Sequence, residues 1–387
     1  EVAFATSARF RPAVEAAGFT FFPAGLDRET DPDYHRLMAE LANMPPGPES
    51  ERVIFDQVFL DLIPRRMATD LLEVARRWQP DMLLRESAEL GSTIVAECLG
   101  LPYADVLPGV WVKGEGVWLQ DAARHLDPLR ASFGLDPDPD LEALHPYLAI
   151  AISPPSLALR DLDGPRPYPA TTHFIHTVYY DQGDHASLPR WVFDLPERPT
   201  VYVTMGTEVP AMPGAGYYPR VYQAIVEGLR NEPFNVIVTI GREQDPAQLG
   251  PQPPNVHVER YIPQSLLLPH CDVVVSHGGT NTLLQTLDAG LPMVMVPLIA
   301  DQFMNGALYR TMQLGPVIDL EKLTPEAVRT AVYDALKNAT YRKNIDCLRA
   351  EMDALPGLDY AVRLVEEVAG VHQPVEPMAL AELEMAC

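Results

Sequence analysis

The feature that most constrains the fold is a repeated alternation of short apolar runs with helical patterns. In the first half the runs are VAFAT, FTFFPAG, DMLLRES and LPYADVL, each bounded by turn residues. Such runs indicate buried parallel strands, and their alternation with helices indicates βαβ units. The second half continues with TVYVTMG, NVIVTIG, NVHVERY, CDVVVSHGG and PMVMVPL. We therefore predict an α/β protein with two doubly wound, Rossmann-like domains.

A Pro-rich stretch, LPRWVFDLPERP, separates the two halves and is typical of an interdomain linker. The predicted boundaries are an N-terminal domain over 1–187, a linker over 188–199 and a C-terminal domain over 200–357. A helix over 358–370 follows, and the weakly patterned tail over 371–387 is expected to be disordered. Ligands of open α/β sheets bind outside the carboxyl ends of the strands, so we expect the strand exits of both domains to face a cleft.

The charge balance excludes nucleic acid as a partner. The chain has 29 Lys and Arg against 53 Asp and Glu, a formal net charge of -24, which repels polyanions. An anionic ligand would have to be held locally, for example by a helix N-terminus. The apolar runs are much shorter than the roughly 18 residues of a membrane span, so no membrane insertion is expected.

The cysteines form no C-x-x-C pair, which fits neither a disulfide framework nor a zinc cluster. We interpret all of them as reduced thiols of a cytoplasmic protein. They are Cys98, Cys271, Cys347 and Cys387.

The most informative segment is ERYIPQSLLLPHCDVVVSHGGTNTLLQTLDAGLPMVMVPLIADQFMNGAL. CDVVVS predicts a buried strand, Gly278 and Gly279 allow a tight turn, and Thr280 begins a helix. The free N–H groups and the dipole of the first helical turn can hold a diphosphate without a lysine. His277 could donate a hydrogen bond to the same phosphate, although capping the strand would also explain it.

Four motifs follow one another along this segment: Y-I-P-Q, H-G-G-T-N-T, A-G-L-P and A-D-Q-F-x-N. Their order and spacing are those of a known protein family. Together they resemble the nucleotide-sugar signature of the family 1 glycosyltransferases, which have the two-domain GT-B fold. P-T-V-Y-V-T-M-G-T and PDMLLRESAELGSTIVAECLGLP extend the resemblance over most of the chain. The chain is similar to bacterial enzymes that attach sugars to polyketides, antibiotics and other natural products. The resemblance implies an inverting transfer of a hexose or deoxyhexose from a nucleotide diphosphate to a small apolar acceptor.

The resemblance also implies a donor site in the C-terminal domain. Tyr261 and Ile262 would frame the nucleobase, with Gln264 beside the base and ribose. Asp301 and Gln302 would hold hydroxyls of the sugar. The residues expected to contact the diphosphate are Thr207, His277, Gly279, Thr280, Asn281 and Thr282. Purely structural roles also stay open. Asp301 could be a helix N-cap, Tyr261 could be a core residue, and Thr207 could hydrogen-bond only within its own turn.

Gln285 is a departure from the family pattern, because many members carry there a Glu that grips both ribose hydroxyls. A carboxylate accepts from two hydroxyls, whereas an amide offers one acceptor group and one donor group. A deoxyribose lacks the second hydroxyl and loses little by this exchange. We therefore hypothesise that a thymidine-diphosphate (TDP) sugar is preferred over a uridine-diphosphate (UDP) sugar.

The expected chemistry is displacement at the anomeric carbon, with charge growing on the leaving diphosphate. The helix N-terminus and His277 would stabilise that charge, so we expect neither a metal nor a cofactor. The D-x-D pattern in DPDPD (136–140) could suggest a metal-bound nucleotide. Its alternating prolines after SFGL indicate a solvated turn instead.

The family's base is a His in a loop after the first strand, and both are absent from this sequence, in which EVAFAT matches the second strand. We expect the native polypeptide to extend upstream with that strand and loop. Glu86 stands where the family carries the carboxylate partner of the base. A solvated loop carboxylate is the alternative for Glu86, and Glu89 is a competitor on the same loop. The histidines with no recognisable carboxylate partner, which we do not assign as base, are His125, His145, His173 and His176.

Aromatic residues Tyr103, Trp111 and Trp118 are expected beyond a strand exit of the N-terminal domain. They suit a flat, apolar acceptor, and packing of an irregular insertion over 109–146 explains them equally well. Two other functions stay open: an epimerase of the same fold and a non-catalytic binding protein. Homodimerisation is also left open.

Overall fold

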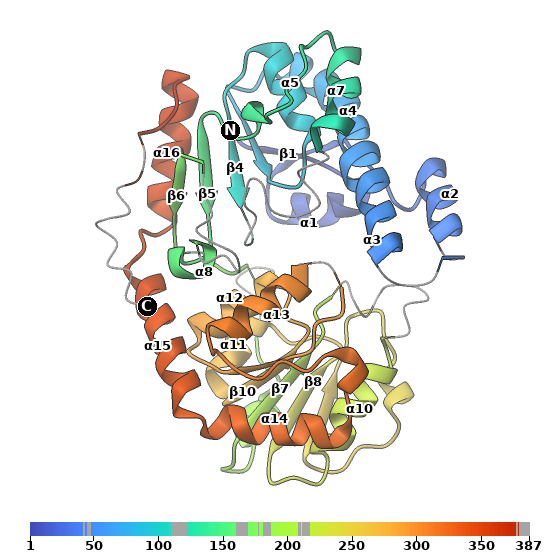
Figure 1. Cartoon of the computed structure of the whole chain (residues 1–387), viewed down its shortest axis with the longest axis vertical. Coiled ribbons are helices and arrows are strands. Elements are labelled where there is room, and N and C mark those ends of the chain that lie inside the picture. The colour runs from blue at the N-terminus through green and yellow to red at the C-terminus, as the bar shows by residue number, and fades with distance from the viewer. Residues whose placement is uncertain are drawn as a thin grey trace. The chain divides into compact units, whose positions relative to one another are not determined.

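The computed structural model describes residues 1–41, 43–44, 48–107, 109, 122–159, 169–176, 178–180, 187–207, 210, 217–299, 301–376 and 378. The chain folds into two compact units (Figure 1). Unit 1 is built from Glu1–Ile152, Arg166–Ile175 and Pro356–Leu380, and unit 2 from His176–Leu355 with Ser153–Pro165. Among the helices of these described ranges, none is both long and apolar enough to cross a membrane.

Unit 2 contains a five-stranded parallel sheet in the order β11-β10-β7-β8-β9. Its strands are β7 (Thr200–Thr204), β8 (Asn235–Thr239), β9 (Val256–Glu259), β10 (Val273–Ser276) and β11 (Met293–Met295). The chain moves outward from β7 to β9 and then returns to β10 on the other side of β7. The strand order therefore reverses between β7 and β10, which is where open α/β sheets bind ligands.

Four described helices of unit 2 follow its strands, as the alternating pattern predicts: α10 (Arg220–Leu229), α11 (Gln264–Leu267), α12 (Thr280–Asp288) and α13 (Asp301–Thr311). Its other described helices are α8 (Pro155–Leu159), α14 (Pro325–Lys337) and α15 (Ala339–Ala354). Short 3-10 turns are η4 (Arg190–Asp194), η5 (Pro246–Leu249), η6 (Leu268–His270) and η7 (Leu320–Lys322).

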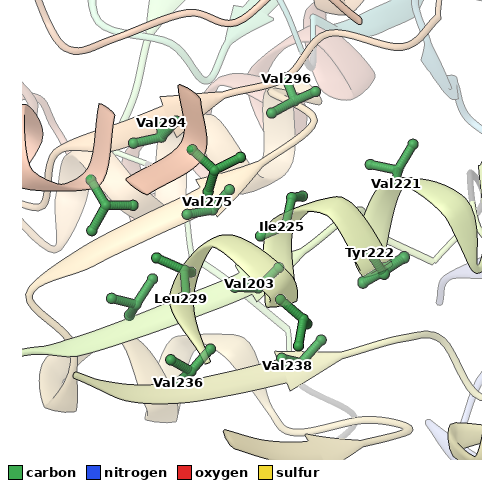
Figure 2. Close-up of a cluster of buried hydrophobic side chains, with 14 of the residues drawn as sticks. Val203, Val221, Tyr222, Ile225, Leu229, Val236, Val238, Val275, Val294 and Val296 are labelled. Carbon is green, nitrogen blue, oxygen red and sulfur yellow. The ribbon is translucent and has the colours of Figure 1, made fainter. Parts of the chain in front are cut away.

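One face of this sheet is covered by α10 and α14. Val203, Val238 and Val275 project from the strands against Ile225 and Leu229 of α10 (Figure 2). All five side chains are fully buried or nearly so. Because strand residues alternate between faces, Ser276 belongs to the opposite face, where α12 packs against α13 and α15.

Unit 1 contains two parallel sheets. β1 (Ala3–Thr6) pairs with β2 (Thr20–Pro23). β3 (Leu83–Glu86), β4 (Tyr103–Leu107), β5 (Leu148–Ala151) and β6 (Thr172–Phe174) form the other sheet in chain order. No described ladder joins β1 to β3, and Phe4 and Leu84 on these strands are 44% and 56% exposed. Ala5 and Leu83 nevertheless pack into the same apolar cluster.

Helices of unit 1 surround these sheets. They are α1 (Arg11–Ala16), α2 (Pro32–Leu41), α3 (Pro48–Ile54), α4 (Ile63–Trp78), α5 (Gly91–Leu99), α7 (Ala122–Ser132) and α16 (Leu358–Val371). A π-helical segment, η2 (Phe55–Leu62), runs directly into α4, and the 3-10 turns are η1 (Ala8–Phe10) and η3 (Glu142–Leu144). Helices α4 and α5 pack closely at Gly91, because a Cβ added to this residue would lie 2.4 Å from the carbonyl oxygen of Pro64 on α4.

The segments after residue 187 and after residue 357 pack on different units. In the predicted linker, the Trp191 ring stacks on His257 of unit 2 with centroids 4.4 Å apart. The predicted C-terminal helix is present as α16, which packs on the sheet of unit 1 through Ala361, Leu364 and Val368. The tail was expected to be disordered from 371 on, and this is wrong for its first residues. Val375 is buried, and its N–H donates to Tyr147 O at 3.0 Å.

The cysteine prediction is correct for Cys98 and Cys271, which are free. Cys347, on α15, is disulfide-bonded, so the interpretation of all four cysteines as reduced thiols is wrong there. Spacing along the chain carried no sign of this pairing, because disulfides depend on distance in space. Cys387 lies outside the described residues.

Candidate active site

The predicted donor residues follow the carboxyl ends of the strands of unit 2. Thr207 follows β7, Tyr261 follows β9, His277 follows β10 and Asp301 follows β11. Because all five strands are parallel, these residues lie along one edge of the sheet. Gly206 follows β7 and His277 follows β10, the two strands between which the strand order reverses. The two residues are in contact, because a Cβ added to Gly206 would lie 2.9 Å from His277 Nε2.

His277 is a buried histidine between two glycines. Its side chain is covered so well that the residue is only 8% exposed. A Cβ on Gly279 would lie 2.7 Å from His277 Nε2, so glycine on both sides makes room for the ring. Ser276 Oγ lies 3.0 Å from His277 Nδ1, and Nε2 has no hydrogen-bond partner among the described residues. Burial lowers the pKa of His277 to about 4, so the ring is neutral at pH 7.

The N-terminus of α12 is open to an anion at part of its first turn. Gly279 is the N-cap residue and has no side chain to accept from the helix. The Thr280 N–H already donates to Asp301 Oδ2 at 3.3 Å, and Thr280 Oγ1 donates to the same oxygen at 2.8 Å. Asn281 and Thr282 have no recorded acceptor for their N–H groups within the described ranges. These two amides are therefore the ones best placed to bind a phosphate oxygen.

The tight turn before α12 depends on its glycine. Gly278 has a φ of +79°, which disfavours any side chain, and a Cβ there would lie 2.4 Å from Met295 Sδ. Asn305 Nδ2 donates to Gly278 O at 3.0 Å, to Thr280 Oγ1 at 3.1 Å and to Asp301 Oδ2 at 3.1 Å. Asn305 ends the A-D-Q-F-x-N motif but was not predicted as a site residue. It ties α13 to the turn that carries His277.

The two residues predicted to hold sugar hydroxyls both make internal hydrogen bonds. Asp301 is the first residue of α13, and its Oδ2 is occupied by Thr280 and Asn305. Gln302 is 4% exposed, and its Oε1 accepts from the N–H groups of Leu298 and Ile299 at 2.9 and 3.0 Å. Asp301 therefore has one carboxylate oxygen, and Gln302 its amide nitrogen, without a recorded partner among the described residues.

The predicted nucleobase residues form a second part of the same edge. The Arg242 guanidinium carbon lies 3.8 Å from the centroid of the Tyr261 ring, a stacked cation–π contact. Ile262 is buried at 2% exposure, and Gln264 begins α11. Arg242 was missed from the sequence, although the G-R after the NVIVTI strand places it at a strand exit. Thr207 is exposed in the turn after β7.

Gln285 lies in the second turn of α12 and is 7% exposed. Its Nε2 donates to Asn281 Oδ1 at 3.0 Å. Its Oε1 is buried with no partner among the described residues. An unpaired buried acceptor costs about 1 to 3 kcal/mol.

In unit 1, the two candidate carboxylates after β3 have different environments. Glu86 is exposed, and its Oε1 accepts from Ser87 Oγ at 3.1 Å and from Ala88 N at 3.0 Å. Glu89 caps α5 by accepting from the N–H groups of Gly91 and Ser92 at 2.7 and 3.0 Å. Burial raises the pKa of Glu89. Of the two, Glu86 is accessible to a partner, whereas Glu89 serves the helix.

A buried charge network holds the loop after β3, which carries Glu86. Arg85 and Asp105 form an ion pair between β3 and β4, with side chains 2% and 1% exposed. Arg85 Nη1 also donates to Ser87 O and Glu89 O at 3.0 and 2.8 Å. Asp105 Oδ2 lies 2.5 Å from His145 Nδ1. The network fixes the backbone of the loop that carries Glu86.

The sequence interpretation that these histidines lack a carboxylate partner was wrong for His145 and His176. His145 has Asp105, and His176 Nε2 lies 2.9 Å from Asp288 Oδ1. Neither carboxylate is near its histidine in the sequence, so the sequence alone did not reveal these pairs. His145 precedes β5, so it lies at the amino end of that strand.

The predicted acceptor residues are only partly within the described residues. Tyr103 is the first residue of β4 and lies at the amino end of the strand, so its predicted place beyond a strand exit is wrong. It is 3% exposed, its ring meets Tyr147 edge-on at 5.8 Å, and burial raises its pKa. Tyr103 is a core residue. Trp111 and Trp118 lie outside the described residues.

The DPDPD segment uses its central carboxylate to cap a turn. Asp138 accepts from the N–H groups of Glu142 and Ala143 at 2.9 and 3.0 Å. Among the described residues, the group whose ligand atoms could share a cation is His176, Asp288 and Asp353. Asp353 is exposed, and the other two already form the hydrogen bond given above.

This arrangement matches a type of site that commonly binds phosphate groups. A parallel sheet whose strand order reverses beside an uncapped helix N-terminus is the common site for phosphate groups in Rossmann-like domains. Here the backbone amides of α12 and the neutral His277 meet at that position.

Comparisons with known proteins agree with this type of site. Residues 225–368 match the family described as "Erythromycin biosynthesis protein CIII-like, C-terminal domain". The chain is 30% identical to the elloramycin glycosyltransferase ElmGT of Streptomyces olivaceus, covering 77% of this chain and 72% of that one. It is 27% identical to the tylactone mycaminosyltransferase of Streptomyces fradiae, covering 79% and 68%. The structure of the Streptomyces sp. SF2575 glycosyltransferase SsfS6 complexed with thymidine diphosphate aligns with a TM-score of 0.70 at 28% identity, covering 95% and 91%.

The chain belongs to the family 1 glycosyltransferases and has the GT-B fold. It is an enzyme that transfers sugars. The family, fold class and enzyme class predicted from the motifs are thereby confirmed, and the epimerase and binding-protein alternatives are set aside.

Proposed function

We propose that this enzyme is an inverting, cytoplasmic glycosyltransferase of natural-product biosynthesis that uses a TDP-sugar and an apolar, hydroxylated acceptor. The observation that carries the donor proposal is the open first turn of α12 beside the Nε2 of His277. It is supported by relatives named for antibiotic and macrolide glycosylation and by the SsfS6 complex with thymidine diphosphate.

In this proposal the acceptor oxygen attacks the anomeric carbon while the bond from that carbon to the diphosphate oxygen breaks. The nucleoside diphosphate leaves with the electron pair. The N–H groups of Asn281 and Thr282 and the Nε2–H of His277 stabilise the charge that develops on it. These neutral donors need no metal ion to act. The free oxygen of Asp301 and the amide of Gln302 hold sugar hydroxyls.

The acceptor's proton passes to a general base. The resemblance assigns this role to a His on the loop after the family's first strand, with Glu86 as its carboxylate partner. The Glu86 side chain suits that partnership, because it is exposed and oriented by Ser87 and Ala88. A carboxylate beside a histidine orients the ring and stabilises its charged form.

Turnover tests the proposal. A TDP-hexose and a hydroxylated aromatic polyketide are incubated with the enzyme in the presence of EDTA, and products are followed by chromatography and proton NMR. We expect TDP and a glycoside with inverted anomeric configuration. Retained configuration, or activity that returns only when magnesium or manganese is added, would contradict the proposal.

The preference for TDP follows from Gln285. Its single unpaired acceptor, Oε1, matches the single ribose hydroxyl of a deoxynucleotide. We expect Gln285→Glu to improve the UDP-sugar relative to the TDP-sugar by about 1 kcal/mol or more, the scale of one charge-assisted hydrogen bond. The measurement is kcat/KM for UDP-glucose and TDP-glucose in both proteins.

Gln223→Glu is the matched control, because it adds the same charge on α10, on the other face of the sheet. This control should leave the donor ratio unchanged. A wild-type preference for UDP-glucose, or an unchanged ratio in Gln285→Glu, would refute the assignment.

A further inference from the structure

Ser276 is the last residue of β10 and is completely buried. Its hydroxyl lies between two groups of the following turn. Ser276 Oγ is 3.0 Å from His277 Nδ1, and the Gly278 N–H points to the same oxygen at 3.5 Å. The hydroxyl is therefore placed behind the histidine, on the ring atom opposite Nε2.

The hydrogen bonds allow two arrangements of the protons. In one, the Ser276 hydroxyl donates to Nδ1, and Oγ accepts the weak contact from Gly278 N–H. In the other, Nδ1–H donates to Oγ, and the hydroxyl proton then needs a further acceptor, which the described residues around it do not provide. Buried polar groups are almost always paired, so the first arrangement is favoured.

A neutral imidazole carries its proton on one nitrogen only. Burial lowers the pKa of His277 to about 4, so the ring is neutral in the physiological range. If Nδ1 accepts from Ser276, the proton is on Nε2. That nitrogen is bordered by Gly206 and Gly279, whose missing side chains leave it beside the N-cap of α12.

We propose that Ser276 is a positioning residue that keeps His277 in the tautomer with a proton on Nε2, so that this N–H can donate to the leaving diphosphate. The inference rests on the proposed function, because it needs the diphosphate at α12. It adds that His277 acts as a neutral donor of fixed direction. With the other tautomer, a lone pair would face the phosphate oxygens and repel them.

The position of the His277 ring proton can be measured directly in the unliganded wild-type enzyme. Nitrogen-15 NMR of labelled histidine distinguishes a protonated ring nitrogen from an unprotonated one, with His277→Ala assigning the signals. We expect Nε2 to be protonated and Nδ1 to be unprotonated and hydrogen-bonded. A protonated Nδ1 would overturn the inference, whatever the enzyme binds.

Binding tests the consequence. Ser276→Ala should raise the Kd of TDP about five- to tenfold, on the order of one hydrogen bond, and Ser276→Thr, which keeps the hydroxyl, should restore most of the affinity. In the His277→Ala background, Ser276→Ala should have no further effect, because Ser276 acts through the ring. Equal losses in both backgrounds would show a merely structural role and overturn the inference. Failure of the wild type to bind TDP would instead refute the proposed function, while the NMR result would still decide the tautomer.

Discussion

Asp105→Ala is expected to destabilise unit 1 by about 3 to 5 kcal/mol, the usual cost of removing one partner of a buried ion pair. Arg85 would remain 2% exposed without its counterion, and His145 would lose its carboxylate. The Arg85 side chain also holds Ser87 O and Glu89 O, so the loop that carries Glu86 should loosen as well. Urea unfolding measured by circular dichroism gives the change in the unfolding free energy.

Asp61→Ala is the matched control. It removes an Asp that pairs with Arg65 on the surface, where the two side chains are 51% and 42% exposed. The expected loss there is below about 1 kcal/mol. If Asp105→Ala cost no more than this control, the buried network would not support the Glu86 loop as described.

His277→Ala should weaken TDP binding by about 1.5 to 3 kcal/mol, because a hydrogen bond to a charged acceptor is lost. That loss corresponds to a rise in Kd of about 10- to 150-fold. The fold should survive, since the ring makes one recorded polar contact, with Ser276 Oγ. Titration calorimetry measures the Kd, and thermal unfolding checks the fold.

His270→Ala serves as the control in the same unit, because His270 is exposed and contacts the edge of Phe193. It should bind TDP like the wild type. An unchanged Kd in His277→Ala would mean that His277 only supports the turn before α12.

The architecture of unit 2 was predictable because each step is local. Apolar runs such as CDVVVS are strands, and the glycines after them fix where α12 begins. Parallel strands then bring Thr207, Tyr261 and His277 to one edge without any knowledge of side-chain contacts. The family motifs added which edge residues to choose.

The contacts that the sequence did not reveal depend on strand register and distance. Arg85 and Asp105 stand directly opposite each other on β3 and β4, and this pairing appears only when the two strands are aligned. The Thr280–Asp301 hydrogen bond joins two helices that follow different strands. Tyr103 was misplaced because it was expected beyond a strand exit, although the run LPYADVL already contained it and the strand begins at it. Strand register decided the first of these cases, and distance in space decided the second.

The most direct test of the donor site is a crystal structure of the enzyme with TDP. We predict the diphosphate at the first turn of α12, accepting from His277 Nε2 and from the N–H groups of Asn281 and Thr282, with a ribose hydroxyl on Gln285 Oε1. TDP bound elsewhere, or a diphosphate that does not contact His277, would contradict the proposed site.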